Sequence, residues 1–257
     1  MGTPKCPPLL DVRSNEDFAA DPRLAPGSVR RSCEALPEWA AELRGRSAIA
    51  ICRDGLHLSR GVAALLRDAG VQAEALENGM EGWIKNDLPL VPTGKLPARN
   101  RQGRTLWGTR ERPKIDRIGC AWVIRRFVDP AALFMFVAPS EVAPVAERFG
   151  AAPFDVEGVF RSHRGEACTF DVMVEEFGLR LPALLRLATI VRAADTARLD
   201  LAPEAPGLLA ASFGLLRMHA DDLEQLEDGL TLYDAFYRWC RDATNETHDW
   251  PTNKKGA

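Results

Sequence analysis

The sequence contains no apolar run long enough to cross a membrane. No window approaches the roughly 18 apolar residues that a spanning helix requires, and the segment Met1 to Pro8 lacks the apolar stretch of a signal peptide. We therefore expect no membrane partner and a chain that stays in the cytoplasm.

The sequence also has little excess charge of either sign. Its 33 Lys and Arg residues nearly balance 36 Asp and Glu residues, which gives a formal net charge of −3 and a pI of about 5.9. A chain without a positive field does not recruit nucleic acid, and we recognise no basic helix-turn-helix. Nucleic acid is not expected as a partner, and any anion site must be local.

Paired cysteines are missing as well. The six cysteines contain no C-x-x-C pair, and a chain of 257 residues is too large to need disulfides for stability. Reduced thiols are the better interpretation, so each cysteine has to be judged singly.

What remains is ordinary globular composition, with 46% apolar and 27% charged residues. At ~100–200 residues per domain, the length fits two domains. The segment from Pro89 to Arg112 loses periodicity and gains Pro and Gly, so we place the connection there. The predicted division is a first domain at 1–92, a linker at 93–111, a second domain at 112–251 and a tail at 252–257.

The two domains differ in pattern. Short apolar runs at 9–12 and 48–51 and a strand-like run at 71–76 alternate with a helical period at 61–69, which predicts an α/β domain with a parallel sheet and flanking helices. Beyond residue 114 helical periods dominate, at 118–125, 184–194, 206–218 and 222–241, with a strand at 133–137. The second domain is predicted to be helix-rich α+β.

Cys52 directly follows a predicted buried strand and opens a loop that enters a helix near Ser59. Backbone N–H groups of such a loop point at a common centre, and the helix dipole adds positive potential there. We expect the sulfur at this centre, as a nucleophile or as the carrier of a persulfide. Gly55 supplies the positive φ that the curl needs, and Arg53, His57 and Arg60 are nearby cations. The alternative is that Cys52 is a small buried apolar residue.

Five segments in order resemble the rhodanese homology domain: 10–13 (LDVR), 26–29 (PGSV), 52–59 (CRDGLHLS), 76–83 (LENGMEGW) and 88–90 (LPL). The resemblance implies a parallel sheet with helices on both faces and Cys52 as the sulfur-carrying residue, with Asp11 and Arg13 supporting the domain. It also implies an anion- or persulfide-binding loop made of Arg53, Asp54, Gly55, Leu56, His57, Leu58, Ser59 and Arg60. Ser59 lies seven residues after Cys52, one more than in common rhodaneses, and Leu58 stands where phosphatases need Arg. We therefore exclude phosphatase chemistry.

The second domain offers two candidate groups of polar residues. Asp116 and Cys120 share a helix face beside Arg117, and a loop gathers Glu157, His163, Cys168 and Asp171. Glu157, His163, Cys168 or Asp171 are the candidate ligands of a transition metal, although their spacing matches no strong zinc signature. An oxyanion pocket of Arg117, His163 and Arg164 is the alternative, and ordinary loop hydrogen bonding is a third interpretation.

Several motifs between 106 and 251 resemble the C-terminal domain of ChrB-type chromate-resistance proteins. They are the segments 112–130, 154–158, 162–171, 190–196 and 237–240. The fourth of these segments adds Asp195 to the candidate site residues. The resemblance implies a role in chromate resistance or in its sensing, with no assigned chemistry.

Three functions follow as hypotheses. The first is a rhodanese-type sulfurtransferase linked to chromate resistance, with a small sulfur donor or oxyanion such as thiosulfate or chromate and a thiol acceptor as partners. Sulfur transfer itself requires no cofactor. The second is a chromate- or sulfate-sensing protein with a catalytically degenerate rhodanese domain, and the third is a metal-dependent enzyme in the second domain.

Overall fold

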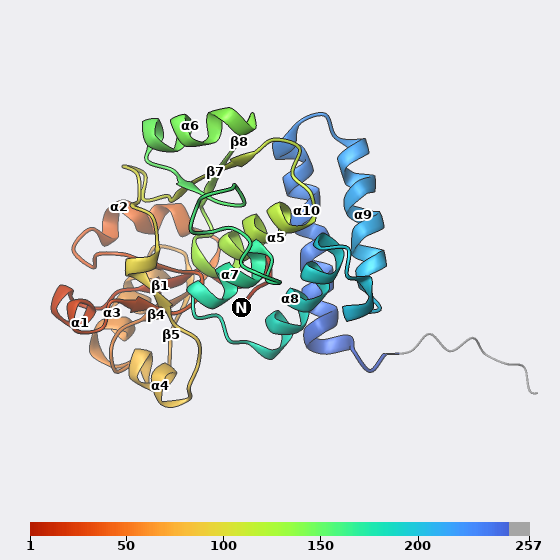
Figure 1. The fold of residues 1–257 in the computed structure, drawn as a ribbon. Helices are drawn as coiled ribbons and strands as arrows, with labels where there is room; N and C mark the ends of the chain where they lie inside the picture. The colour runs from red at the N-terminus through yellow and green to blue at the C-terminus, as the bar shows by residue number, and fades with distance from the viewer. Residues whose placement is uncertain (247–257) are drawn as a thin grey trace, which may run out of the picture.

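The computed structural model describes residues 1–246 and has a mixed α/β architecture. The predicted class is confirmed, because a parallel sheet with flanking helices is followed by a helix-rich second half (Figure 1). The predicted domain end at residue 251 and the tail at 252–257 lie outside the described residues.

The strands are β1 (Leu9–Asp11), β2 (Arg23–Leu24), β3 (Ser28–Arg30), β4 (Ser47–Ile51), β5 (Gln72–Ala75), β6 (Val91–Pro92), β7 (Leu106–Arg110), β8 (Leu133–Val137) and β9 (Ala152–Pro153). The α-helices are α1 (Asn15–Ala20), α2 (Leu36–Ala40), α3 (His57–Asp68), α4 (Gly79–Lys85), α5 (Ile115–Val123), α6 (Val142–Phe149), α7 (Thr169–Glu176), α8 (Pro182–Asp195), α9 (Ala205–Met218) and α10 (Asp222–Arg238). Two π-helical turns, Ile124–Val128 and Trp239–Ala243, extend α5 and α10. None of the helices in this part of the chain is long and apolar enough to cross a membrane.

The first sheet has the order β3-β1-β4-β5, with all neighbours parallel. Alternate residues of β4 belong to different cores: Ala48 and Ala50 pack with residues of α3, and Ile51 packs with Met80 of α4. This period-two division buries both faces of the sheet. It places the end of β4, and therefore Cys52, at the centre of the first domain.

The second sheet has the order β8-β7-β9 and is also parallel. Its central strand β7 lies inside the segment that the sequence predicts as a linker. The reason is burial: Trp107 is fully buried, and Thr105 donates to the buried carboxylate of Asp129 through its N–H and its hydroxyl, both at 2.7 Å. A short strand among Pro and Gly residues has too few alternations to be recognised from pattern alone.

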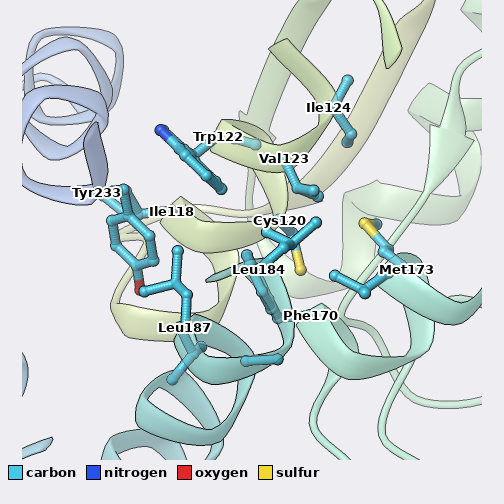
Figure 2. Packing of buried hydrophobic residues seen from close by; sticks show 14 of the residues in the cluster. Ile118, Cys120, Trp122, Val123, Ile124, Phe170, Met173, Leu184, Leu187 and Tyr233 are labelled. Carbon is cyan, nitrogen blue, oxygen red and sulfur yellow. The ribbon is translucent and has the colours of Figure 1, made fainter. Parts of the chain in front are cut away.

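Helices α5, α7, α8, α9 and α10 pack around one large core (Figure 1). Trp122 lies at its centre, in contact with the rings of Phe170, Tyr233 and Tyr237. Figure 2 shows Cys120 in the same cluster of buried side chains. This packing fixes the first turns of α5 and α7 against each other, and the polar residues of the second domain gather there.

The two halves of the chain are in direct contact. The N–H of Gly27 donates to the carbonyl of Phe127 at 2.6 Å, and Arg161 donates to the carbonyl of Lys95 at 2.6 Å. Val91 of β6 packs in the core of the second half. The segment around β6 is therefore held against the second half at Val91 and Lys95.

Candidate functional site

Cys52 is the first residue after β4, one of the two inner strands of the first sheet, and the residue is 3% exposed. Its thiol lies 3.1 Å from Oγ of Ser59, on the first turn of α3, and 3.4 Å from Oδ1 of Asp54. The N–H of Leu56 donates to the same Asp54 oxygen at 2.9 Å. The sulfur therefore contacts two side-chain oxygens. The sequence predicts a ring of backbone amides around the sulfur, but the amide of Leu56 donates to the Asp54 carboxylate instead.

Two glycines hold the loop in place. Gly55 has the predicted positive φ of 75°, and an added Cβ would lie 2.5 Å from the carbonyl oxygen of Leu76. Gly79, at the start of α4, has a φ of 51°, and its Cβ would lie 2.4 Å from the carbonyl oxygen of Cys52. Only glycine permits these approaches, so the cysteine loop is fixed backbone to backbone against the segment before α4.

The other predicted loop residues face outward. The Arg53 guanidinium forms ion pairs at the surface, with Asp17 at 3.1 Å and with Glu81 at 3.4 Å. The remaining four side chains of the predicted loop, Leu56, His57, Leu58 and Arg60, are exposed.

Asp11 and Arg13 form a buried ion pair at the end of β1. The Arg13 guanidinium donates to both carboxylate oxygens of Asp11, at 2.5 to 3.1 Å, and also to the carbonyls of Asp21 and Arg23. Both side chains are at most 2% exposed. The pair ties the strand end to the segment that enters β2, which is a supporting role for the domain.

A second group of side chains gathers in the C-terminal half. Nε2 of His163 lies 3.3 Å from Oδ2 of Asp116, 3.3 Å from Oδ2 of Asp195 and 3.6 Å from Oδ1 of Asp155. These residues come from the first turn of α5, the last residue of α8 and the loops around β9. The sequence predicts Asp116, His163 and Asp195 as separate candidates, and the structure brings them together.

Asp116 anchors this group. Its two carboxylate oxygens accept hydrogen bonds of 2.8 Å from the backbone N–H groups of Thr169 and Phe170, at the start of α7. The side chain is 2% exposed. A carboxylate at a helix N-terminus is favoured by the free amides and by the helix dipole, so Asp116 is rigidly placed.

Asp155 is the residue of this group that the sequence analysis misses. It follows β9 with a φ of 50°, accepts from the Thr169 hydroxyl at 3.1 Å, and pairs with Arg117 at 2.7 Å and Arg110 at 3.3 Å. An acidic residue two positions after a strand end is the signal that could have indicated it. The charge of Arg117 is neutralised by this contact.

The predicted metal ligands are therefore only partly brought together. Cys168 is fully buried as the residue before α7, where its thiol donates to Asp171 at 3.2 Å, and Asp171 in turn accepts from Arg192 at 2.7 Å. Glu157 is exposed on its loop. Of the predicted set only His163 belongs to the group around Asp116, because closeness in sequence does not make loop side chains point the same way.

The predicted oxyanion pocket is not formed by its three residues. Arg117 is paired with Asp155, His163 faces three carboxylates, and the Arg164 guanidinium lies 4.1 Å from the ring centre of Phe160. Cys120 donates weakly to Asp116 at 3.6 Å inside the core. The surroundings of His163 are electronegative, and an oxyanion would be repelled there.

The ionisation of this group is shifted toward protonated forms. The Asp116 carboxylate beside the ring raises the pKa of His163 to about 8. Burial, followed by the charge of Asp116, raises the pKa of Asp195 to about 6. Burial raises the pKa values of Asp171 and of the Cys168 and Cys120 thiols. Near neutral pH His163 and Asp195 can therefore take up or release protons.

A surface hollow of about 430 Å³ is lined by the loop and helix residues that flank this group, Gly165, Glu166, Ala167, Arg192, Thr196, Arg198 and Leu201. Thr196 directly follows Asp195, and Gly165 lies two residues after His163. The hollow is therefore lined by the chain segments that directly follow His163 and Asp195.

Comparison with known proteins places the second half in one family. The family model described as ChrB, C-terminal domain, matches residues 107–240. Protein ChrB of Cupriavidus metallidurans is 32% identical over 223 residues, which cover 78% of this chain and 66% of that protein. The chain thus spans just under two thirds of the length of this relative.

Two solved structures match the first half. A rhodanese-related protein from Thermoplasma volcanium is 25% identical, covers 33% of this chain and 82% of its own, and has a TM-score of 0.29. A probable thiosulfate sulfurtransferase is 30% identical, covers 34% of this chain and 43% of its own, and has a TM-score of 0.29.

Proposed function

Because this chain belongs to the family of the ChrB C-terminal domain, we propose that it is a cytoplasmic chromate-resistance protein whose first half transfers sulfur through a persulfide on Cys52. The activity is assigned to the strand-loop-helix segment around Cys52. We assign to the second half the specificity for an oxyanion or a protein partner.

The observation that carries the proposal is the contact between Cys52 and Ser59. The sulfur stands at the end of a central parallel strand, 3.1 Å from a hydroxyl on the first turn of α3. The first amides of a helix have no acceptor within the helix, and the dipole favours negative charge at that end. A persulfide that extends from Sγ past Ser59 would meet these donors.

The proposed reaction has two balanced steps. The Cys52 thiol loses its proton to solvent, and the thiolate attacks the outer sulfur of thiosulfate. The S–S bond of thiosulfate breaks, sulfite leaves with the electron pair, and Cys52 carries the persulfide. A thiophilic acceptor such as a thiolate or cyanide then attacks the terminal sulfur and releases the Cys52 thiolate.

A second function is favoured by a different feature of the same loop. The Cys52 side chain is only 3% exposed, and the Asp54 carboxylate lies 3.4 Å from its sulfur. The negative charge of this carboxylate would repel a persulfide anion on Cys52. In this alternative the first half is catalytically inactive, and the protein senses chromate or sulfate.

The test compares thiosulfate-to-cyanide sulfur transfer by the wild type, Cys52→Ser and Cys6→Ser. Cys6 is a matched control, because it lies outside the loop and its thiol donates to the carbonyl of Pro7. We expect Cys52→Ser to fall to the uncatalysed rate and Cys6→Ser to keep the wild-type rate. Equal rates for wild type and Cys52→Ser would remove the sulfurtransferase proposal, and a chromate-dependent rise in Tm would then favour the sensor.

A further inference from the structure

The group around His163 has the form of a metal site. We propose that Asp116, His163 and Asp195 bind one divalent first-row transition metal ion through a carboxylate oxygen of each aspartate and Nε2 of the histidine. The three candidate ligand atoms all lie within 4.8 Å of one another. The site is separate from the sulfur chemistry proposed for Cys52.

The spacing of the atoms suits a single ion. Nε2 of His163 is 3.3 Å from the nearest oxygen of Asp116 and 3.3 Å from that of Asp195. Two ligands bound at roughly 2.0–2.2 Å to one ion in tetrahedral or octahedral geometry are about 3.0–3.5 Å apart. The ring and the two carboxylates can therefore close on an ion with little rearrangement.

Hydrogen bonding alone does not explain the arrangement. One ring nitrogen faces three carboxylates, at 3.3, 3.3 and 3.6 Å, and it can carry only one proton. Each of these distances is longer than a normal N–H···O bond of about 2.7–3.2 Å. An ion, unlike a proton, can be shared among several such donors.

The carboxylates of the group are held in place by contacts with residues outside it. Asp116 is fixed by the amides of Thr169 and Phe170 at 2.8 Å. Asp155, which lies next to the site, is fixed by Arg117 and by the Thr169 hydroxyl. Such supporting hydrogen bonds orient ligands in known metal sites.

The donor set determines the class of metal. Two carboxylate oxygens and one imidazole suit Mn²⁺, Fe²⁺, Co²⁺ or Zn²⁺. The neighbouring thiols of Cys120 and Cys168 are buried and donate to Asp116 and Asp171, so they do not offer thiolates that would select Cu⁺. Three protein ligands leave at least one position for water or a substrate.

The histidine of the group is partly exposed to solvent. The His163 side chain is 42% exposed, and the residues that flank His163 and Asp195 line the hollow of about 430 Å³. Arg192 and Arg198 lie on its wall. Both guanidinium groups are paired with carboxylates, Arg192 with Asp171 at 2.7 Å and Arg198 with Asp200 at 3.2 Å.

The experiment titrates the EDTA-treated and dialysed full-length protein with ZnCl₂ and MnCl₂ by calorimetry, and records the absorption spectrum with CoCl₂. The variants are His163→Ala and Asp195→Asn, which alter an exposed loop residue and a carboxylate at a helix end. The matched control is His219→Ala, because His219 also pairs with a carboxylate, Asp228 at 2.8 Å, but lies outside the group. Circular dichroism checks that each variant folds.

We expect one equivalent of metal for the wild type, with at least tenfold weaker binding by His163→Ala and Asp195→Asn and unchanged binding by His219→Ala. Cys52→Ser should bind like the wild type, which separates this test from that of sulfur transfer. The proposal is overturned if the wild type binds none of the three ions, or if the two site variants bind them as the wild type does.

Discussion

The thiol of Cys52 lies 3.1 Å from the hydroxyl oxygen of Ser59, seven residues further along the chain, and both side chains are buried. The contact joins the end of the central strand β4 to the first turn of α3. It makes Ser59 the nearest side-chain partner of the sulfur, closer than Asp54.

The Ser59→Ala variant should therefore slow sulfur transfer without unfolding the domain. Alanine is favoured in helices, and the loss of one hydrogen bond of about 1 kcal/mol corresponds to a rate roughly five- to tenfold lower. Initial rates of thiocyanate formation measure the effect. Ser47→Ala, which changes an exposed serine of β4, serves as the control, and an equal loss in both variants would contradict a specific role for Ser59.

The Gly55→Ala variant should destabilise the protein more than Gly45→Ala does. Both glycines have a φ of 75°, but a Cβ on Gly45 meets no atom within 4 Å, whereas a Cβ on Gly55 lies 2.5 Å from the carbonyl oxygen of Leu76. We expect a loss of about 1 kcal/mol at Gly45 from the positive φ, and about 2 kcal/mol more at Gly55 from the clash. Urea denaturation measures both free energies of unfolding, and equal losses would mean that the loop is not held against the segment before α4.

The Asp11→Asn variant should cost about 3–5 kcal/mol, because it leaves the buried Arg13 guanidinium without its counter-charge. Asp21→Asn provides the comparison, since Asp21 and Arg23 form an exposed pair, for which we expect a loss of at most about 1 kcal/mol. The two variants can be compared by thermal and urea unfolding. Similar small losses in both would show that the Asp11–Arg13 pair does not support the first domain.

His163 should make the stability of the metal-free protein depend on pH. Its folded pKa of about 8 exceeds the ordinary value of 6.5, so its contribution is fully present below pH 6.5 and is lost as the pH rises through 8. Solvent screens a ring that is 42% exposed, and we expect at most about 1 kcal/mol. Unfolding of the wild type and His163→Gln in EDTA should differ most near pH ~6 and converge near pH ~9. A difference that stays constant over this range would contradict the ion pairing.

Local patterns in the sequence determine much of the first domain. The short runs at 9–12 and 48–51 predict β1 and β4, which are buried inside the sheet. The strand-like run at 71–76 predicts β5, an edge strand in which exposed polar residues alternate with alanines. The place of Gly55 in a loop between a strand and a helix predicts its positive φ. In the second half, the helical periods predict α8, α9 and α10, and the apolar run at 133–137 coincides with β8.

Other features were decided by the tertiary structure. The burial of Trp107 makes β7 a central strand within a segment rich in Pro and Gly. The partners of the Cys52 sulfur depend on where Asp54 points within its loop.

The tertiary structure also decides that Asp116, His163 and Asp195 lie close together. It depends on how α5, α7 and α8 pack around Trp122 and Phe170. A sequence specifies which residues are polar and which faces are apolar, because these are properties of neighbouring residues. Which distant side chains share a site is decided only when the core has packed.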